Sequence, residues 1–119
     1  MSASRSKGTT WETQIVGYLQ EHGWPYAERR ALGGNHDRGD IAGVVGVVIE
    51  AKNTRHIDLA GFLDEALAEA ANDHADLGVA WVKRRGKRSP EHGYVVMNGA
   101  TFVQLLVDAG YSNDLLPAS

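Results

Sequence analysis

Gly39-Asp-Ile-Ala-Gly-Val-Val-Gly-Val-Val-Ile-Glu-Ala-Lys52 is the stretch that decides the fold. It contains two runs rich in β-branched residues, and Gly43 and Gly46 separate them as in a turn between strands. The second run begins with Val47-Val48-Ile49, which is wholly apolar and therefore typical of a buried central strand. We expect a β-hairpin here whose second strand lies in the interior of a sheet.

Helical patterns are found on both sides of this hairpin. Upstream, Thr9 can cap a helix of residues 9–22 that stops at Gly23, and an extended segment of residues 26–32 then completes a three-strand meander. Downstream, Asp58 can open a second helix that ends before Gly78. Strands at 79–83 and 94–97 follow, and the last helix is expected between Asn98 and Gly110.

The order of these elements is αβββαββα. Because the strand after the second helix follows a long crossover, it can pair in parallel with the strand that ends at Lys52. The predicted fold class is α/β, with a mixed central β-sheet flanked by helices. Three tryptophans are expected in its core, although one at the surface could stack on a base: Trp11, Trp24 and Trp81.

The composition is that of one ordinary globular domain spanning residues 1–119, with loose termini at 1–8 and 115–119. With 43% hydrophobic and 23% charged residues, the chain can form a core without a cofactor, and it contains no cysteine. This excludes disulfide scaffolds, thiolate zinc sites and cysteine nucleophiles, and it suits a cytoplasmic protein. The apolar run from Ile41 to Ile49 is about half of the ~20 residues needed to cross a bilayer, so we expect no membrane span.

Asp40, Glu50 and Lys52 are the candidate chemical groups of the hairpin. Side chains alternate along a strand, so Glu50 and Lys52 project from one face and Ala51 from the other. A hairpin can bring Asp40 beside Glu50, and two carboxylates with the Ala51 carbonyl form a hard oxygen site suited to Mg²⁺, or to Mn²⁺ as a substitute. Lys52 can then orient a water molecule or offset charge in a phosphoryl transition state.

A simpler interpretation is that Glu50 and Lys52 form a solvated pair at the end of a strand. A Glu-x-Lys triple occurs by chance about once in a few hundred positions at average composition. Exposed pairs of this kind contribute little to stability. The acid upstream and the apolar run between the charges distinguish this triple from such a pair.

The pattern Asp-x(9)-Glu-x-Lys resembles the core of the PD-(D/E)XK nuclease superfamily, with Gly39 in place of the signature's loosely kept proline. The start, Arg5-Ser-Lys-Gly-Thr-Thr-Trp-Glu-Thr-Gln-Ile-Val16, resembles the first helix of archaeal-type Holliday-junction resolvases. The resemblance covers residues 5–83 and implies a restriction-endonuclease-like core. It also implies that Asp40 and Glu50 are metal ligands and that Lys52 is the catalytic lysine. Glu12 corresponds to the acidic active-site residue of the first helix, which binds the metal or its water.

Two features leave alternatives open. Thr9-Thr-Trp-Glu12 also fits a capping box, in which Glu12 binds the amide of the cap residue and not a metal. The loop at 33–38 lacks the serine that such resolvases often carry there. Junction specificity is therefore less strongly implied than nuclease chemistry.

Positive charge is concentrated in one loop, although the net charge of the chain is −3. Lys83-Arg-Arg-Gly-Lys-Arg88 has five cations in six residues and is a candidate phosphate-binding loop or, alternatively, a solubilising turn. Further candidate DNA contacts are Lys7, Arg29, Arg30, Arg38 and Arg55.

The function implied by the resemblance is a Mg²⁺-dependent, homodimeric endonuclease of DNA recombination and repair that cleaves branched DNA, most of all four-way junctions. Two alternatives are a related nuclease acting on flaps, forks or modified duplexes, and a nuclease-like domain that binds DNA without cleaving it. The apolar residues at 102–107 and the tail residues Leu115 and Leu116 are candidates for the dimer interface.

Overall fold

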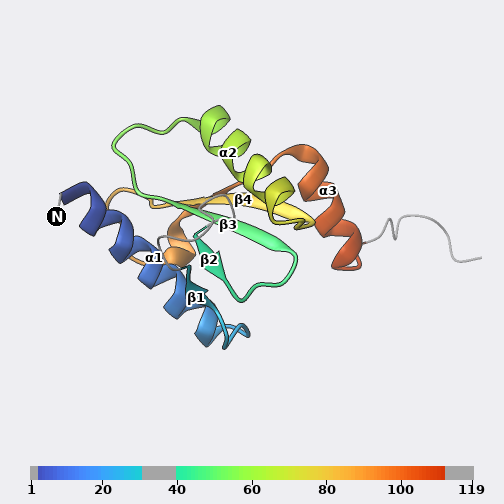
Figure 1. The fold of residues 1–119 in the computed structure, drawn as a ribbon, viewed down its shortest axis with the longest axis horizontal. Coiled ribbons are helices and arrows are strands. Elements are labelled where there is room, and N and C mark those ends of the chain that lie inside the picture. The colour runs from blue at the N-terminus through green and yellow to red at the C-terminus, as the bar shows by residue number, and fades with distance from the viewer. Residues whose placement is uncertain (1–2, 31–39, 112–119) are drawn as a thin grey trace, which may run out of the picture.

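A five-stranded mixed sheet with three α-helices forms the body of the molecule (Figure 1). The computed structural model describes residues 3–30 and 40–111, with side chains from residue 7 onward. The elements are α1 (Ala3–Glu21), β1 (Glu28–Arg29), β2 (Ile41–Ala42), β3 (Val47–Lys52), α2 (Leu59–Asn72), β4 (Leu77–Val82), the 3₁₀ helix η2 (Pro90–His92), β5 (Tyr94–Val96) and α3 (Gly99–Asp108). Arg38, the loop at 33–37 and the tail at 115–119 lie outside the described residues.

The expected meander is formed by β1, β2 and β3, which pair antiparallel. Ile41 lies opposite Ile49, and the turn between β2 and β3 contains Gly43 and Gly46 with positive φ values of 95° and 83°. A side chain at Gly43 would also collide with the Tyr26 backbone. Both glycines are therefore required by the turn that sets the register of β3.

The sheet becomes mixed at β3, which pairs in parallel with β4 after the crossover through α2. The predicted parallel pairing is confirmed, and β3 is the middle strand in the order β1-β2-β3-β4-β5. Asp58 caps α2 as expected, since its side chain accepts a hydrogen bond from the Gly61 amide at 2.9 Å. Asn98 caps α3 in the same way, through the Thr101 amide at 2.8 Å.

Helices α1 and α2 cover opposite faces of the sheet (Figure 1). The α1 side holds the larger apolar cluster, formed by residues of α1, β2, β3 and β4: Trp11, Ile15, Leu19, Ala27, Ile41, Ile49 and Val79. A smaller cluster on the α2 side joins Phe62 to Ala80 and Val82. β3 is therefore enclosed on both faces, as its apolar sequence predicts.

The start of α1 differs from the prediction. The helix begins at Ala3 and not at Thr9, so residues 3–8 are helical and not loose. Thr9 lies inside the helix, where its carbonyl accepts a hydrogen bond from Thr13 Oγ1 at 3.0 Å. A threonine inside a helix cannot be its N-cap, so the capping box with Glu12 is not formed.

Of the three tryptophans predicted in the core, Trp24 lies at the surface, as do other aromatic and apolar side chains. Trp24 is 43% exposed and is not a core residue, because it follows the end of α1, where Gly23 turns the chain. His22 is also exposed and stacks on Tyr18 with ring centroids 4.1 Å apart. In α3 only Thr101 is buried, while Phe102, Val103 and Val107 are exposed.

Helices able to cross a membrane were not found in the described part of the chain: each is too short or too polar.

Candidate functional site

The alternation of side chains along β3 separates the charged residues from the core. Ala51 packs against the cluster on the α1 side, as Ile49 does. Glu50 and Lys52 project toward α2, where Lys52 contacts Glu65 and Phe62. The prediction that Glu50 and Lys52 share a face of the strand is confirmed, and α2 covers that face.

Asp40 is held beside these groups by the edge of the β2–β3 pairing. Its amide donates to the Ile49 carbonyl at 3.0 Å, and its carboxylate Oδ2 accepts from the Ala51 amide at 2.8 Å. The β2–β3 register, with Ile41 opposite Ile49, places Asp40 opposite Glu50. The hairpin thus brings Asp40 to Glu50-Ala51-Lys52, as the sequence predicts.

The environment of Asp40 favours its protonated form. Burial raises the pKa of Asp40 from its ordinary value of 3.8 to about 6. The charges of Glu12 and Glu65 also raise this pKa, whereas the hydrogen bond from Ala51 and the charge of Lys52 lower it. A group that is costly to ionise and surrounded by other acids is typical of a site that holds a cation.

Glu50 is the most enclosed charged residue of the site. Only 2% of it is exposed, and its Oε1 is buried without a hydrogen-bond partner among the described residues. Its other oxygen, Oε2, lies 3.8 Å from Lys52 Nζ. This separation allows a Coulombic attraction but no hydrogen bond, so the carboxylate is incompletely satisfied.

Lys52 is held from three sides. Its Nζ donates to Glu65 Oε2 at 2.6 Å, attracts Glu50 and lies 5.4 Å from the centroid of the Phe62 ring. The lysine side chain is only 16% exposed. The ammonium therefore has a fixed position at the end of β3, in contrast to the solvated pair that is the simpler interpretation of the sequence.

Glu12 approaches the site from α1. Its carboxylate accepts from Arg29 Nε at 3.0 Å, and its charge acts on Asp40. The charge of Glu12 therefore influences Asp40. Among the described residues, however, Glu12 forms its ion pair with Arg29 on β1. Sequence reasoning did not foresee this ion pair.

A group of three carboxylates was missed by sequence reasoning. Within the described residues, Glu50, Glu65 and Glu69 form the one group whose candidate metal-binding atoms all lie within 4.8 Å of one another. Glu65 and Glu69 are four residues apart and so share one face of α2. They flank the apolar stripe of Phe62, Ala66 and Ala70, and this is the signal that could have identified them.

Three of the cations predicted to bind DNA lie around one cavity. A cavity of about 470 Å³ at the end of β3 is lined by Lys7, Thr10, Trp11, Gln14, Asn53, Lys83 and Arg88. The Lys83 amide donates to the Lys52 carbonyl at 2.8 Å, so this basic cavity adjoins the strand that carries the carboxylates. Asn53 and Gln14 are polar lining residues that sequence reasoning did not single out.

The other candidate cations are distributed differently. Arg84, Arg85 and Lys87 are exposed on the loop after β4, and Arg84 lies over the Tyr94 ring. Arg55 is exposed between β3 and α2. Arg30 is paired with Asp73 at 3.2 Å and Arg29 with Glu12, so part of the charge of these two is already neutralised.

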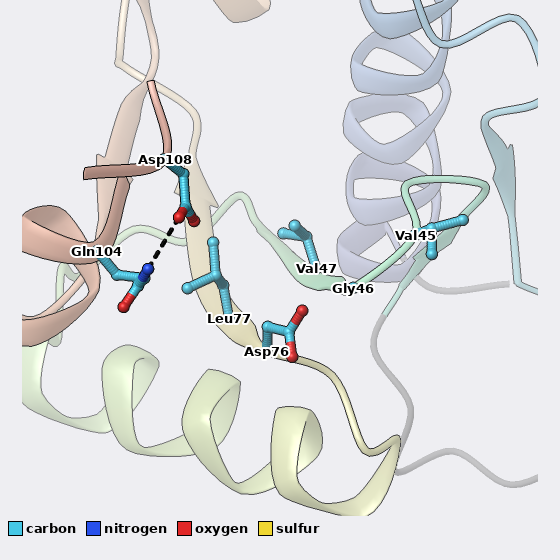
Figure 2. A pocket seen from close by; sticks show the side chains of 7 residues that line it. All are labelled: Val45, Gly46, Val47, Asp76, Leu77, Gln104 and Asp108. Carbon is cyan, nitrogen blue, oxygen red and sulfur yellow. Dashed lines mark hydrogen bonds between the residues drawn. The ribbon is translucent and has the colours of Figure 1, made fainter. Parts of the chain in front are cut away.

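A second cavity, of about 560 Å³, lies at the opposite end of β3 and β4 (Figure 2). Its lining residues are Val45, Gly46, Val47, Asp76, Leu77, Gln104 and Asp108, with Gln104 donating to Asp108 at 2.9 Å. Among the described residues, this lining carries two carboxylates and no cationic side chain. It is therefore unsuited to phosphates and separate from the candidate site.

Comparison of the chain with family models, with curated proteins and with solved structures gives no match.

Proposed function

We propose that this chain is a metal-dependent DNA endonuclease that hydrolyses phosphodiester bonds by the chemistry of the PD-(D/E)XK nucleases. The observation that carries the proposal is the enclosure of Glu50 beside Lys52 at the end of the central strand, with Asp40 opposite. Burying charges costs free energy unless they are paired and hydrogen-bonded. A domain that only bound DNA would have no use for an incompletely satisfied carboxylate in its sheet.

The residues present fit a divalent cation. Glu50 Oε1 is buried and lacks a hydrogen-bond partner among the described residues, so one hard oxygen ligand is available. Asp40, Glu50 and the Ala51 carbonyl would hold Mg²⁺, or Mn²⁺ in its place. When bound, the ion would supply Lewis-acid activation and neutralise charge at the phosphate.

Lys52 and the basic residues have distinct roles in this proposal. Lys52 is fixed by Glu65 and Phe62, so it can orient a water molecule and offset the charge that develops in the transition state. Lys7, Lys83 and Arg88 line the adjoining cavity and would bind backbone phosphates without reading bases.

Branched DNA is the substrate class that we propose, with four-way junctions first. The chain offers one set of Asp40, Glu50 and Lys52, whereas a junction must be cut on two opposed strands. A two-fold homodimer would supply both sites. The exposed Phe102, Val103 and Val107 of α3 are the surface that we propose for it, and sedimentation at micromolar concentration should show a dimer.

Cleavage of labelled DNA tests the proposal directly. Four-way junction, flap, duplex and single strand are incubated with Mg²⁺ or with a chelator. We expect cleavage of the branched forms with Mg²⁺ and none with the chelator. Asp40→Asn and Glu50→Gln should each abolish cleavage, while binding of DNA without metal persists or improves, since each change removes negative charge that faces phosphates.

Asp64→Asn is the matched control, because Asp64 is an exposed acid of α2 beside Glu65. It should cleave like the natural chain. Full Mg²⁺-dependent activity in the purified Asp40 or Glu50 variant would refute the assignment. Cleavage of flaps or duplexes in preference to junctions would retain the nuclease and reject the resolvase, and binding without any cleavage would leave a DNA-binding domain.

A further inference from the structure

The carboxylates that face β3 from α2 are not among the metal ligands of the proposed reaction, in which Glu65 only positions Lys52. Glu65 and Glu69 come from the middle of α2, and with Glu50 their ligand atoms all lie within 4.8 Å of one another. Lys52 is the one cation that the described structure pairs with Glu50 and Glu65. Two of the three carboxylates, those of Glu50 and Glu65, thus share the Lys52 ammonium.

Glu50 provides a separate indication that this space takes a ligand. The residue is 2% exposed, and its Oε1 has no hydrogen-bond partner within the described part of the chain. The cluster contains no donor that satisfies this oxygen, because Lys52 hydrogen-bonds to Glu65 and stays 3.8 Å from Glu50 Oε2. A buried oxygen of this kind requires a proton or a cation.

The three carboxylates lie close enough together for a shared ion. Their candidate ligand atoms are all within 4.8 Å of one another, so modest side-chain adjustments can bring them to the bond lengths of a hard, oxygen-bound divalent cation.

We propose that Glu50, Glu65 and Glu69 form a second divalent-cation site on the α2 side of β3, in addition to the one assigned to Asp40, Glu50 and Ala51. The ion competes with the Lys52 ammonium for Glu65. Because the ion would take up the Glu65 carboxylate that holds Lys52, its binding loosens the position of the lysine. The site shares Glu50 with the proposed nuclease centre but does not depend on nuclease activity.

Mn²⁺ binding without DNA tests the site, measured by electron paramagnetic resonance titration of the free ion. Glu65→Gln and Glu69→Gln should each weaken one class of bound Mn²⁺ by at least about tenfold. Asp64→Asn, the neighbouring exposed acid on the same helix, should bind like the natural chain. Asp40→Asn should retain this class of bound Mn²⁺, because Asp40 is not one of its ligands.

Lys52→Met provides a measurement of opposite sign. Removing the competing ammonium should tighten the same class of Mn²⁺, and the gain should disappear in the double variant with Glu65→Gln. Glu65 is about half exposed, so the fold should tolerate its replacement. The test therefore remains valid even if a change at the more enclosed Glu69 disturbs folding.

The proposal is overturned if the Glu65 and Glu69 variants bind Mn²⁺ like Asp64→Asn, or if Asp40→Asn alone removes all binding. It is also overturned if the Lys52→Met gain persists without Glu65. Failure of the nuclease proposal gives a different result: Mn²⁺ binding follows Glu65 and Glu69 as expected, while no DNA is cleaved with any divalent ion.

Discussion

The two faces of β3 are built from alternate residues of one short strand, yet they differ in chemistry. On the α1 side, Ile49 and Ala51 pack against a cluster that contains Trp11 and Ile15. On the α2 side, Val48 is followed by Glu50 and Lys52, which are nearly as enclosed but charged. The α1 face of the strand packs into the apolar core along its length. The α2 face is apolar at Val48 and charged from Glu50 onward.

This difference separates stability from chemistry. Apolar burial stabilises by about 25 cal/mol per Å² removed from water, so the α1 face holds the sheet and the helix together. A buried ion pair is often no better than a well-packed apolar pair of the same volume. Glu50 and Lys52 are therefore not explained by stability, and changes on the two faces should have different consequences.

The largest effect on stability is expected from the α1 face. Trp11 is fully buried, and its indole N–H donates to the Trp81 carbonyl at 2.9 Å. Trp11→Ala should lower the free energy of unfolding by about 3–5 kcal/mol, because it leaves a cavity and removes the hydrogen bond to Trp81. Urea unfolding measures this loss. Trp24→Ala, at an exposed position, should cost less than ~1 kcal/mol, and equal losses would contradict the assignment of the core to the α1 side.

A change on the α2 face should affect the reaction more than the fold. Lys52→Ala is expected to reduce kcat by about 10²–10³-fold with little change in DNA affinity, since its benefit arises in the transition state. Lys83→Ala is the matched change at the end of the neighbouring strand, and it should weaken DNA binding and leave kcat nearly unchanged. Single-turnover cleavage at saturating enzyme separates the two. Equal falls in binding and turnover for Lys52→Ala would make it an ordinary phosphate contact.

Removal of the Asp40 charge should stabilise the protein at neutral pH. Because the folded-state pKa of Asp40 is raised from 3.8 to about 6, ionisation is harder in the folded chain than in the unfolded one. The penalty of ionising Asp40 is absent well below pH 3.8, grows between about pH 4 and pH 6 and is complete above that range. Asp40→Asn removes the penalty and keeps an oxygen that can accept from the Ala51 amide.

We therefore expect Asp40→Asn to raise the free energy of unfolding by on the order of 2 kcal/mol at pH 7.5 in chelator, and by only about 0.5 kcal/mol at pH 4. Chemical denaturation at the two pH values measures the difference. Asp64→Asn should show no such pH dependence. A loss of stability at pH 7.5 would mean that the Asp40 carboxylate supports the fold, against the separation of the two faces.

The fold follows from the sequence where a single pattern decides it. The glycines at 43 and 46, the apolar Val47-Val48-Ile49 and the cap at Asp58 predict the hairpin, the central strand and α2. The start of α1 does not follow, because Thr9 is a good cap residue and the sequence from Ala3 to Gly8 has no apolar periodicity. Trp24 fails for a related reason: hydrophobicity alone does not show that Gly23 has ended the helix.

The site is predictable only along the strand. Alternation places Glu50 and Lys52 on one face, and the hairpin places Asp40 beside them. The partners from helices depend on how α1 and α2 cross the sheet, which local patterns do not specify. Glu65 and Glu69 were missed for this reason, and the pairing of Glu12 with Arg29 was not foreseen.

The smallest expected effect concerns the ends of the two faces. The α2 face ends in carboxylates, whereas the α1 side ends in the cavity lined by Lys7, Lys83 and Arg88, from which the exposed loop with Arg85 and Lys87 continues. If this loop holds the DNA backbone, Arg85→Ala with Lys87→Ala should weaken binding to all DNA forms alike. The slope of log affinity against log salt should shrink by about one to two units on duplex DNA, because a protein with fewer phosphate contacts releases fewer counterions when it binds.

Arg30→Gln is the control, since the charge of Arg30 is paired with Asp73, and it should change the slope by well under ~1 unit. An unchanged slope in the double variant would make the loop a solubilising turn and confine DNA binding to the cavity.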